Sequence, residues 1–229
     1  MADLQLTWLG HASFRFDSPG GKRVYVDPFL DGPTCPEDEK EPERVDVIAL
    51  THGHNDHVGS TIDLVGRFSP AVVAQIELKS WLGGQGADVG ELPGINKGGT
   101  QDVDGVRFTM THAHHSSSGP NGEYLGEAAG FVVEVENGTK LYFAGDTNVF
   151  TDMQLIGRIH EPDVAILPIG DHFTMGPKEA SIALELLGVS RCVPCHYGTF
   201  PVLHGTPDEL AKLTDVELLV MQPGETITV

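Results

Sequence analysis

The chain has 229 residues, with 14 lysines and arginines against 33 aspartates and glutamates, so its formal net charge is −19. A chain this acidic repels phosphate backbones and anionic lipid, which disfavours a nucleic-acid-binding or membrane-surface protein. Hydrophobic residues make up 40% of the chain. That share and this length are enough to bury a core, and we expect one globular domain covering residues 1–229.

Targeting and cysteine content point to a reducing compartment. The first residues, Met1–Gln5, have neither the basic nor the apolar stretch of a signal peptide. No apolar run approaches the length of a membrane span. Three cysteines fit a reducing compartment better than a disulfide framework. We therefore expect a cytoplasmic protein that acts on a small molecule, without nucleic-acid or membrane partners. The sequence leaves a homo-oligomer open.

The first half of the chain predicts short strands and then helices. The run Val45–Leu50 is β-branched and without polar alternation, which predicts a buried strand. The proline-rich segment Gly32–Arg44 is a candidate lid, and Gly83–Gly99 is an irregular connection. The remaining expected elements are strands at Leu4–Leu9, Ser13–Phe16, Arg23–Val26 and Ala71–Ala74, and helices at Ser60–Phe68 and Ile76–Leu82.

The second half predicts two hairpins followed by alternating strands and helices. The pair Asn137-Gly138 is a strong hairpin signal. The expected strands are Thr100–Val103, Val106–Thr111, Ala129–Glu136, Thr139–Phe143, Asp163–Pro168 and Cys192–Pro194, and the expected helices follow Thr151 and cover Pro177–Leu187 and Pro207–Leu213. A run of hairpins followed by alternating strands and helices occurs twice, which predicts two sheets with helices outside them.

Three imidazoles and a carboxylate lie within six residues, directly after the strand predicted at Val45–Leu50. They are His52, His54, Asp56 and His57. His52 and His54 project to one side of an extended segment. Burying so many polar rings without a partner is costly, and nitrogen and oxygen donors of this kind suit zinc. The pattern predicts a metal site.

This segment resembles the His-x-His-x-Asp-His signature of the metallo-β-lactamase superfamily. The wider pattern resembles its small branch of uncharacterised metal-dependent hydrolases, relatives of the ascorbate-6-phosphate lactonases. The resemblance is carried also by Trp8-Leu9-Gly10-His11, Val26-Asp27-Pro28, Ala113-His114-His115-Ser116-Ser117, Ala144-Gly145-Asp146-Thr147, Gly170–Pro177 and Pro194–Phe200. It implies a four-layer αββα sandwich with a dinuclear centre between the edges of its two sheets.

The resemblance also implies the ligands of two divalent cations. Zinc is the first expectation, and manganese and iron remain open. One cation takes His52, His54 and His115, the other takes Asp56, His57 and His196, and Asp146 bridges them. His112 and His114 are alternatives to His115.

Two further residues are candidates for supporting roles. Asp27 is either a turn residue before proline or a carboxylate that orients the metal-binding histidines. His11 matches the family pattern near the pocket. The Cys-x-x-Cys-His run at Cys192–His196 also fits haem attachment, but Cys192 and Cys195 face opposite sides of a strand and no export signal is present.

The expected reaction is hydrolysis. Two cations share a water, lower its pKa toward neutrality and produce a bridging hydroxide, which attacks a small ester, lactone or phosphoester. Catalytic roles then fall to Asp56, His11 and Asp27. Basic residues near the motifs are few, with Arg15, Lys97 and Lys178 as candidates. The helix start at Pro177, beside His172, is a candidate anion seat.

Two rival functions use the same scaffold. A metal oxidoreductase is the first, although the diiron members of the superfamily that resemble flavoproteins carry a Glu where this chain has His54. A non-catalytic protein that retains metal and binds a ligand is the second. Fold alone does not choose among them.

Overall fold

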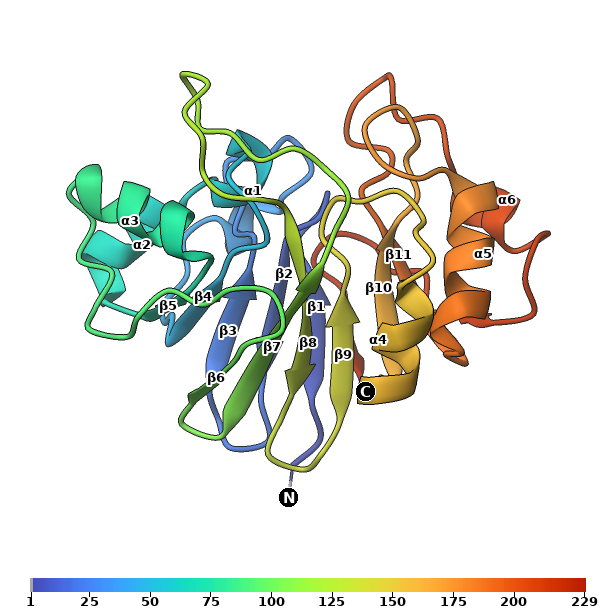
Figure 1. The fold of residues 1–229 in the computed structure, drawn as a ribbon, viewed down its shortest axis with the longest axis horizontal. Helices are drawn as coiled ribbons and strands as arrows, with labels where there is room; N and C mark the ends of the chain where they lie inside the picture. The colour runs from blue at the N-terminus through green and yellow to red at the C-terminus, as the bar shows by residue number, and fades with distance from the viewer. Residues whose placement is uncertain (1) are drawn as a thin grey trace.

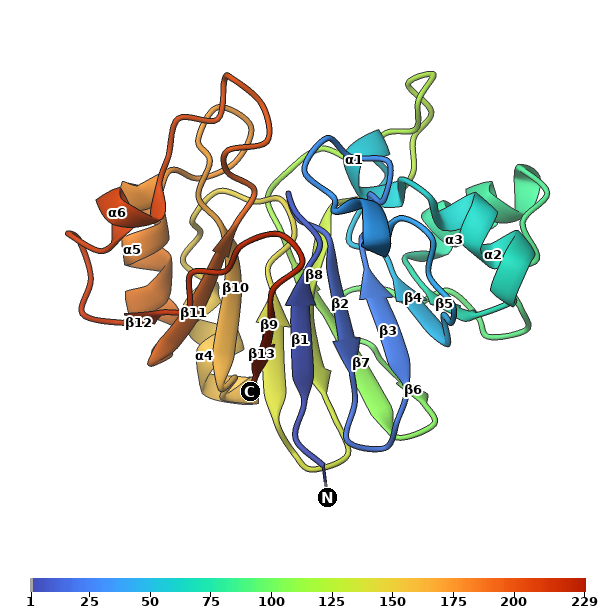
Figure 2. The same cartoon turned by 180° about the vertical axis from the view of Figure 1, so that it is seen from behind.

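Two β-sheets stack face to face, and helices cover the outer face of each. The structure is a computed structural model that describes residues 2–229. Helices α1–α3 flank one side of the sandwich and α4–α6 the other (Figures 1 and 2). This arrangement confirms the predicted α/β sandwich.

The first sheet consists of strands from the N-terminal half of the chain and, at one edge, the last strand of the chain. Its six strands run in the order β13-β1-β2-β3-β4-β5. Its bounds are β1 (Gln5–Trp8), β2 (Phe14–Asp17), β3 (Arg23–Val26), β4 (Val47–Ala49), β5 (Ala71–Val73) and β13 (Thr226–Thr228), and the helices beside it are α1 (Asn55–Val58), α2 (Thr61–Phe68) and α3 (Ile76–Gly84).

The second sheet has seven strands in the order β12-β11-β10-β9-β8-β7-β6. Its bounds are β6 (Thr100–Val103), β7 (Val106–His112), β8 (Ala129–Glu134), β9 (Lys140–Phe143), β10 (Val164–Pro168), β11 (Arg191–Cys195) and β12 (Glu217–Leu218). The accompanying helices are α4 (Met153–His160), α5 (Pro177–Leu187) and α6 (Pro207–Leu210).

Three apolar layers hold the sandwich together. The largest lies between the sheets, where Phe14 meets Phe143 edge-on at 5.8 Å between ring centroids. The second lies between the second sheet and α4–α6, and the third between the first sheet and α2–α3. Cys195 faces the inter-sheet layer and Cys192 the helical one, so alternation along β11 keeps the two thiols on opposite faces as predicted.

One edge of the sandwich collects the carboxyl ends of many strands. β3, β4 and β5 pair in parallel, as do β9, β10, β11 and β12. β1 runs the same way as β3 because both are antiparallel to β2, and β7 the same way as β9 because both are antiparallel to β8. These ends meet at the edge where α1 lies, at the top of Figure 1. In α/β proteins, ligands bind at this kind of edge.

The predicted elements agree with the structure over most of the chain, with differences at element ends. α6 ends at Leu210 rather than at the predicted Leu213. Asp56 and His57, for which no helix was predicted, lie in the single-turn helix α1. The segment 32–44 contains a short 3-10 helix, Glu37–Glu39, and buries Cys35 in the layer beside α2 and α3.

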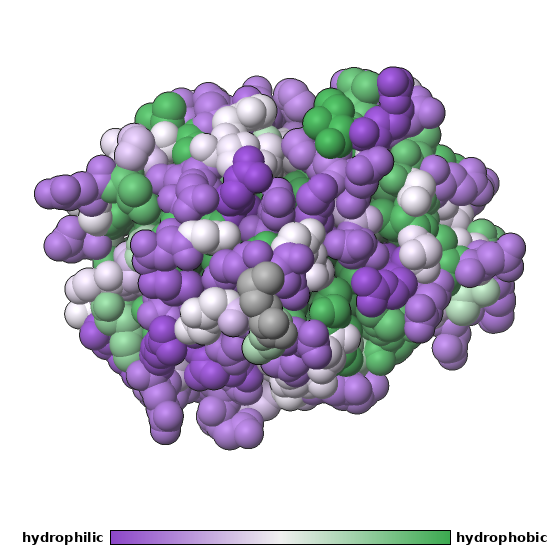
Figure 3. Space-filling model, turned by 90° about the horizontal axis from the view of Figure 1, so that it is seen from below, coloured by the Kyte–Doolittle hydropathy of each residue, from purple (hydrophilic) through white to green (hydrophobic). Residues whose placement is uncertain are grey.

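Two further features of the fold are the hydrophilic surface at one end and the length of its helices. The end opposite α1 is mostly hydrophilic, with scattered apolar patches (Figure 3). Among residues 2–229, no helix is long and apolar enough to cross a membrane.

Candidate metal centre

One buried carboxylate sets the orientation of two imidazoles. Asp27 Oδ2 lies 2.8 Å from His57 Nδ1 and accepts the Thr51 hydroxyl at 2.6 Å. The Thr51 hydroxyl has one proton, so its oxygen accepts from His52 Nδ1 at 3.0 Å. Both rings therefore carry a proton on Nδ1, and both Nε2 atoms keep a lone pair for a cation. Such outer partners fix the tautomer and aim of metal-binding histidines.

A first group of donors consists of His52, His54 and His115. One nitrogen from each ring lies within 4.8 Å of the others. His52 Nε2 and His54 Nδ1 are 3.0 Å apart. Two nitrogens on one tetrahedral zinc would be separated by about 3.3 Å, so the spacing suits a shared cation.

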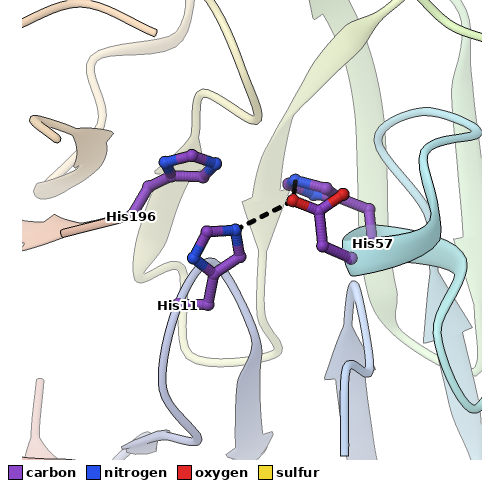
Figure 4. Close-up of side chains that lie close together, drawn as sticks. His11, His57 and His196 are labelled. Atoms are coloured by element: carbon purple, nitrogen blue, oxygen red, sulfur yellow. Dashed lines mark hydrogen bonds and ion pairs between the residues drawn. The ribbon is translucent and has the colours of Figure 1, made fainter. Parts of the chain in front are cut away.

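A second group brings together His11, Asp56, His57 and His196, whose donor atoms also lie within 4.8 Å of one another. The rings of His11 and His196 are side by side, with centroids 3.9 Å apart, and His57 approaches from α1 (Figure 4). His11 Nε2 donates to Asp56 Oδ2 at 3.0 Å. Its other nitrogen, Nδ1, lies 3.0 Å from the Thr199 hydroxyl, which donates to it in the neutral ring.

Asp146 lies between the two groups. Its Oδ2 is 3.5 Å from His115 Nε2 and 3.3 Å from His196 Nε2, and its Oδ1 is 3.3 Å from His57 Nε2. Gly145 places it there: a Cβ at that glycine would lie 2.6 Å from the Ala129 carbonyl oxygen, and its φ is +63°. Only glycine combines that conformation with so close an approach of backbone.

Several buried donor atoms of this centre have no hydrogen-bond partner. They are His57 Nε2, Asp146 Oδ1, and both ring nitrogens of His196. Unpaired buried polar atoms are rare because each costs about 1–3 kcal/mol. A cation coordinated by imidazole nitrogens and a carboxylate would satisfy them, so the residues present fit a divalent transition metal.

The site couples groups with opposite pKa shifts. Burial and the nearby His57 lower the pKa of His52 well below 6.5, and burial lowers the pKa of His11 to about 4 despite its bond to Asp56. Burial also opposes protonation of His57, but Asp146 and Asp27 outweigh it and raise its pKa well above 6.5. For Asp146, burial is outweighed by His57 and His196, and its pKa is lowered. The two carboxylates thus make the surroundings of His57 favourable for positive charge.

Backbone strain concentrates around this edge. Among the described residues, eight non-glycine residues have positive φ, and three of them belong to the centre or contact it: His11, Asp27 and His196. Such conformations cost about 1–3 kcal/mol each and cluster at functional sites.

The structure brings all seven predicted metal residues into these two groups or between them. The two alternatives to His115 lie outside these groups. The ring of His114 stacks on Phe150 with centroids 4.5 Å apart, and His112 lines a different cavity beside α4. Asp27 was predicted as catalytic. It is not one of the described residues that line the pocket beside the centre, and it contacts His57 instead. Two supporting residues were not predicted: Thr51, which directly precedes His52, and Thr199, which lies within the Pro194–Phe200 segment.

A cavity of about 270 Å³ opens onto the centre. It is lined by His54, Asp56, His115, Ser116, Asp146, Phe173 and His196. No residue of the candidate lid, 32–44, belongs to this lining in the described chain. The helix start at Pro177 and Lys178 lines a separate cavity with Asp171.

Comparison with known proteins decides the family. The model of the "Beta-lactamase superfamily domain" family matches residues 22–197. The chain is a member of the metallo-β-lactamase superfamily. Within it, the chain is 48% identical to the "UPF0173 metal-dependent hydrolase" of Herpetosiphon aurantiacus, over 100% of this chain and 99% of that protein. It is 46% identical to a similarly named protein of Koribacter versatilis, over 97% of each.

A solved structure agrees with the fold. Igni18, described as a novel metallo hydrolase from Ignicoccus hospitalis, aligns with a TM-score of 0.87 and 31% identity, over 100% of this chain and 99% of that one. The chain is thus one of the metal-dependent hydrolases of the metallo-β-lactamase superfamily. None of these relatives is named as a lactonase, so the closer likeness to ascorbate-6-phosphate lactonases stays a prediction.

Proposed function

We propose that this metallo-β-lactamase superfamily member hydrolyses a small ester, lactone or phosphoester at a centre of two divalent cations, with zinc the preferred ion. The observation that carries the proposal is the set of orphaned buried donor atoms on His57, Asp146 and His196. Imidazole-rich sets with carboxylates suit zinc, whereas calcium and magnesium prefer oxygen ligands.

The two donor groups divide the ligands. His52, His54 and His115 would hold one cation, and Asp56, His57 and His196 the other, with Asp146 shared. His11 donates to Asp56 and so holds that carboxylate in place rather than replacing it as a ligand. Asp27 keeps the rings of His52 and His57 aimed through Thr51 and through its direct contact with His57.

When bound, such cations lower the pKa of water toward neutrality and polarise a carbonyl or phosphoryl oxygen. The protein supplies the other requirements. Asp56, whose Oδ2 accepts from His11, would also serve as the carboxylate that accepts a proton from water. Burial raises the pKa of Asp56, but the bond from His11 and the charge of His57 outweigh it and leave the pKa below its usual value, so the carboxylate stays ionised at neutral pH.

Removal and return of metal test the proposal. Purified protein is dialysed against a chelator, assayed on a panel of carboxylic esters, lactones and phosphodiesters, and assayed again after zinc, manganese or iron is added. We expect turnover to vanish and return. Asp146→Asn removes the negative charge and one of the two oxygens that could bind metal, so it is expected to lower both metal content and turnover. Asp215→Asn on the exposed surface serves as the control. Metal binding without turnover of any substrate would favour the non-catalytic alternative.

A further inference from the structure

The pocket over the metal centre has one apolar residue among the seven described residues that line it. Six are the polar residues of the centre and its neighbour Ser116, and the seventh is Phe173. About half of the Phe173 side chain, 53%, is exposed. Single exposed apolar residues are common on protein surfaces, so the question is whether something holds this one at the pocket.

The loop that carries Phe173 is fixed at both ends. At its start, the Ile169 N–H donates to the Cys195 carbonyl at 3.0 Å. At its end, Met175 is fully buried, and its N–H donates to the carbonyl of Thr147, the residue after Asp146, at 3.0 Å. The loop is therefore tied to the strand ends that carry His196 and Asp146.

Between these anchors the backbone adopts a strained turn. Asp171 and His172 are consecutive and both left-handed, with φ of +65° and +62°. The Asp171 side chain accepts the His172 N–H at 2.7 Å and stabilises the turn. Non-glycine residues enter this conformation at a cost of about 1–2 kcal/mol each. The strain is retained in a loop that presents Phe173, with the His172 ring edge-on to it at 4.4 Å between centroids.

The charges around the pocket limit what can sit beside Phe173. None of the fourteen lysines and arginines, all within the described residues, lines the pocket. Arg15 is bonded to Glu39 at 2.9 Å and Lys97 to Glu127 at 2.8 Å. Lys178 lines the separate cavity at the start of α5. No lysine or arginine of the pocket would therefore pair with an anionic group outside the reacting bond.

We infer that Phe173 is a specificity-determining residue that stacks against a flat, uncharged apolar group next to the scissile bond. The substrate class is then a neutral ester or lactone with an aromatic or similarly flat substituent, in preference to one with a phosphate or carboxylate outside the reacting group. This inference rests on the proposed function, because the reacting group is placed at the metals. It deepens that function by naming the part of the substrate that the metals do not hold.

Ligand binding tests the inference without turnover. Acetohydroxamic and benzohydroxamic acids chelate metal through the same group and differ in a methyl against a phenyl. Titration calorimetry on the zinc-loaded protein is expected to show benzohydroxamate binding about tenfold more tightly than acetohydroxamate, which is the gain expected from one stacked ring.

Phe173→Ala should remove this preference and Phe173→Trp should keep it. Ile159→Ala, an exposed apolar residue on α4, should leave it unchanged. The carboxylated analogue, 4-carboxybenzohydroxamate, should bind more weakly than benzohydroxamate.

Turnover separates failure of this inference from failure of the proposed function. For phenyl acetate, Phe173→Ala should raise KM about tenfold with a smaller change in kcat, and for ethyl acetate it should change KM less than twofold. Equal losses for both esters, or an unchanged phenyl preference in the hydroxamate titration, would overturn the role of Phe173. If the hydroxamates behave as expected but no ester is hydrolysed, hydrolysis fails while the ligand class stands.

Discussion

Asp27 lies behind His57, with its Oδ2 2.8 Å from Nδ1, and both side chains are almost fully buried. The same carboxylate holds His52 through the Thr51 hydroxyl. One acid outside the pocket therefore positions a histidine of each proposed cation. We expect its effect on function to run through the metals rather than through the substrate.

Replacing this acid should weaken metal binding more than it weakens folding. Asp27→Asn keeps the size of the side chain but removes the charge that His57 and Thr51 address. Loss of such a partner lowers metal affinity by about 10–100-fold. Competition with a chromophoric chelator measures it, with Asp215→Asn, at an exposed position, as the control. Unchanged affinity in Asp27→Asn would remove the orienting role.

The contact between Thr199 and His11 should matter through Asp56. Thr199→Val keeps the shape but removes the hydroxyl that lies 3.0 Å from His11 Nδ1. One hydrogen bond of this kind is worth about 1 kcal/mol, so we expect kcat/KM on phenyl acetate to fall about five- to tenfold. Thr199→Ser restores the hydroxyl and should recover the rate. Equal losses in Val and Ser would indicate a packing role instead.

The metal-free protein should be most stable near pH 6.5. The pKa of His11 falls from 6.5 to about 4 in the folded protein, so the unfolded chain takes up the proton first as pH falls. Stability is then lost between these two values, by about 3 kcal/mol at pH 4. His52 shifts in the same direction. His57 has a raised pKa, so its contribution is constant below pH 6.5 and is lost as pH rises through its folded value.

Urea denaturation in a chelator between pH 4 and pH 9 measures this dependence. We expect the free energy of unfolding to fall on both sides of a maximum near pH 6.5. His11→Asn should flatten the acid side, because its own contribution to the proton uptake is gone. A free energy of unfolding that stays level or rises from pH 6.5 to pH 4 would contradict the assigned burial of neutral histidines.

Metal should stabilise the fold strongly because it binds the native state. A ligand at a thousand times its Kd contributes about 4 kcal/mol. For a chain of this length, 1 kcal/mol moves Tm by about 2–4 °C, so zinc should raise Tm by about 8–16 °C. Differential scanning calorimetry measures the shift. Asp146→Asn should lose most of it, and the exposed Ile159→Ala should keep it.

Much of the fold could be predicted because the local signals are strong. The strand Arg23–Val26 and the helix Pro177–Leu187 have the predicted bounds, and Asn137-Gly138 turns the β8–β9 hairpin. Short elements were less predictable. Pro207–Leu210 has a capping box at Thr206 and Glu209, yet the helix stops after one turn, which helical propensity alone does not foretell.

The seven predicted metal residues lie close together, and the predicted supports Asp27 and His11 lie beside them, whereas Thr51, Thr199 and Phe173 were not predicted. The resemblance to the family, and not the local residue pattern, distinguishes His115 from His112 and His114, because β7 ends at His112 and His115 lies in the following loop. Thr199 and Phe173 reach the centre because the ends of β10 and β11 lie beside those of β1 and β9. That neighbourhood depends on how two sheets stack, which residue spacing does not encode.

Elemental analysis of the purified chain, coupled to ester hydrolysis before and after chelation, tests the two-cation centre most directly. We expect two divalent ions per chain, loss of hydrolysis when they are removed, and recovery when zinc is returned. Full hydrolysis by protein stripped of its ions would contradict a reaction that depends on His52, Asp146 and His196 acting through bound metal.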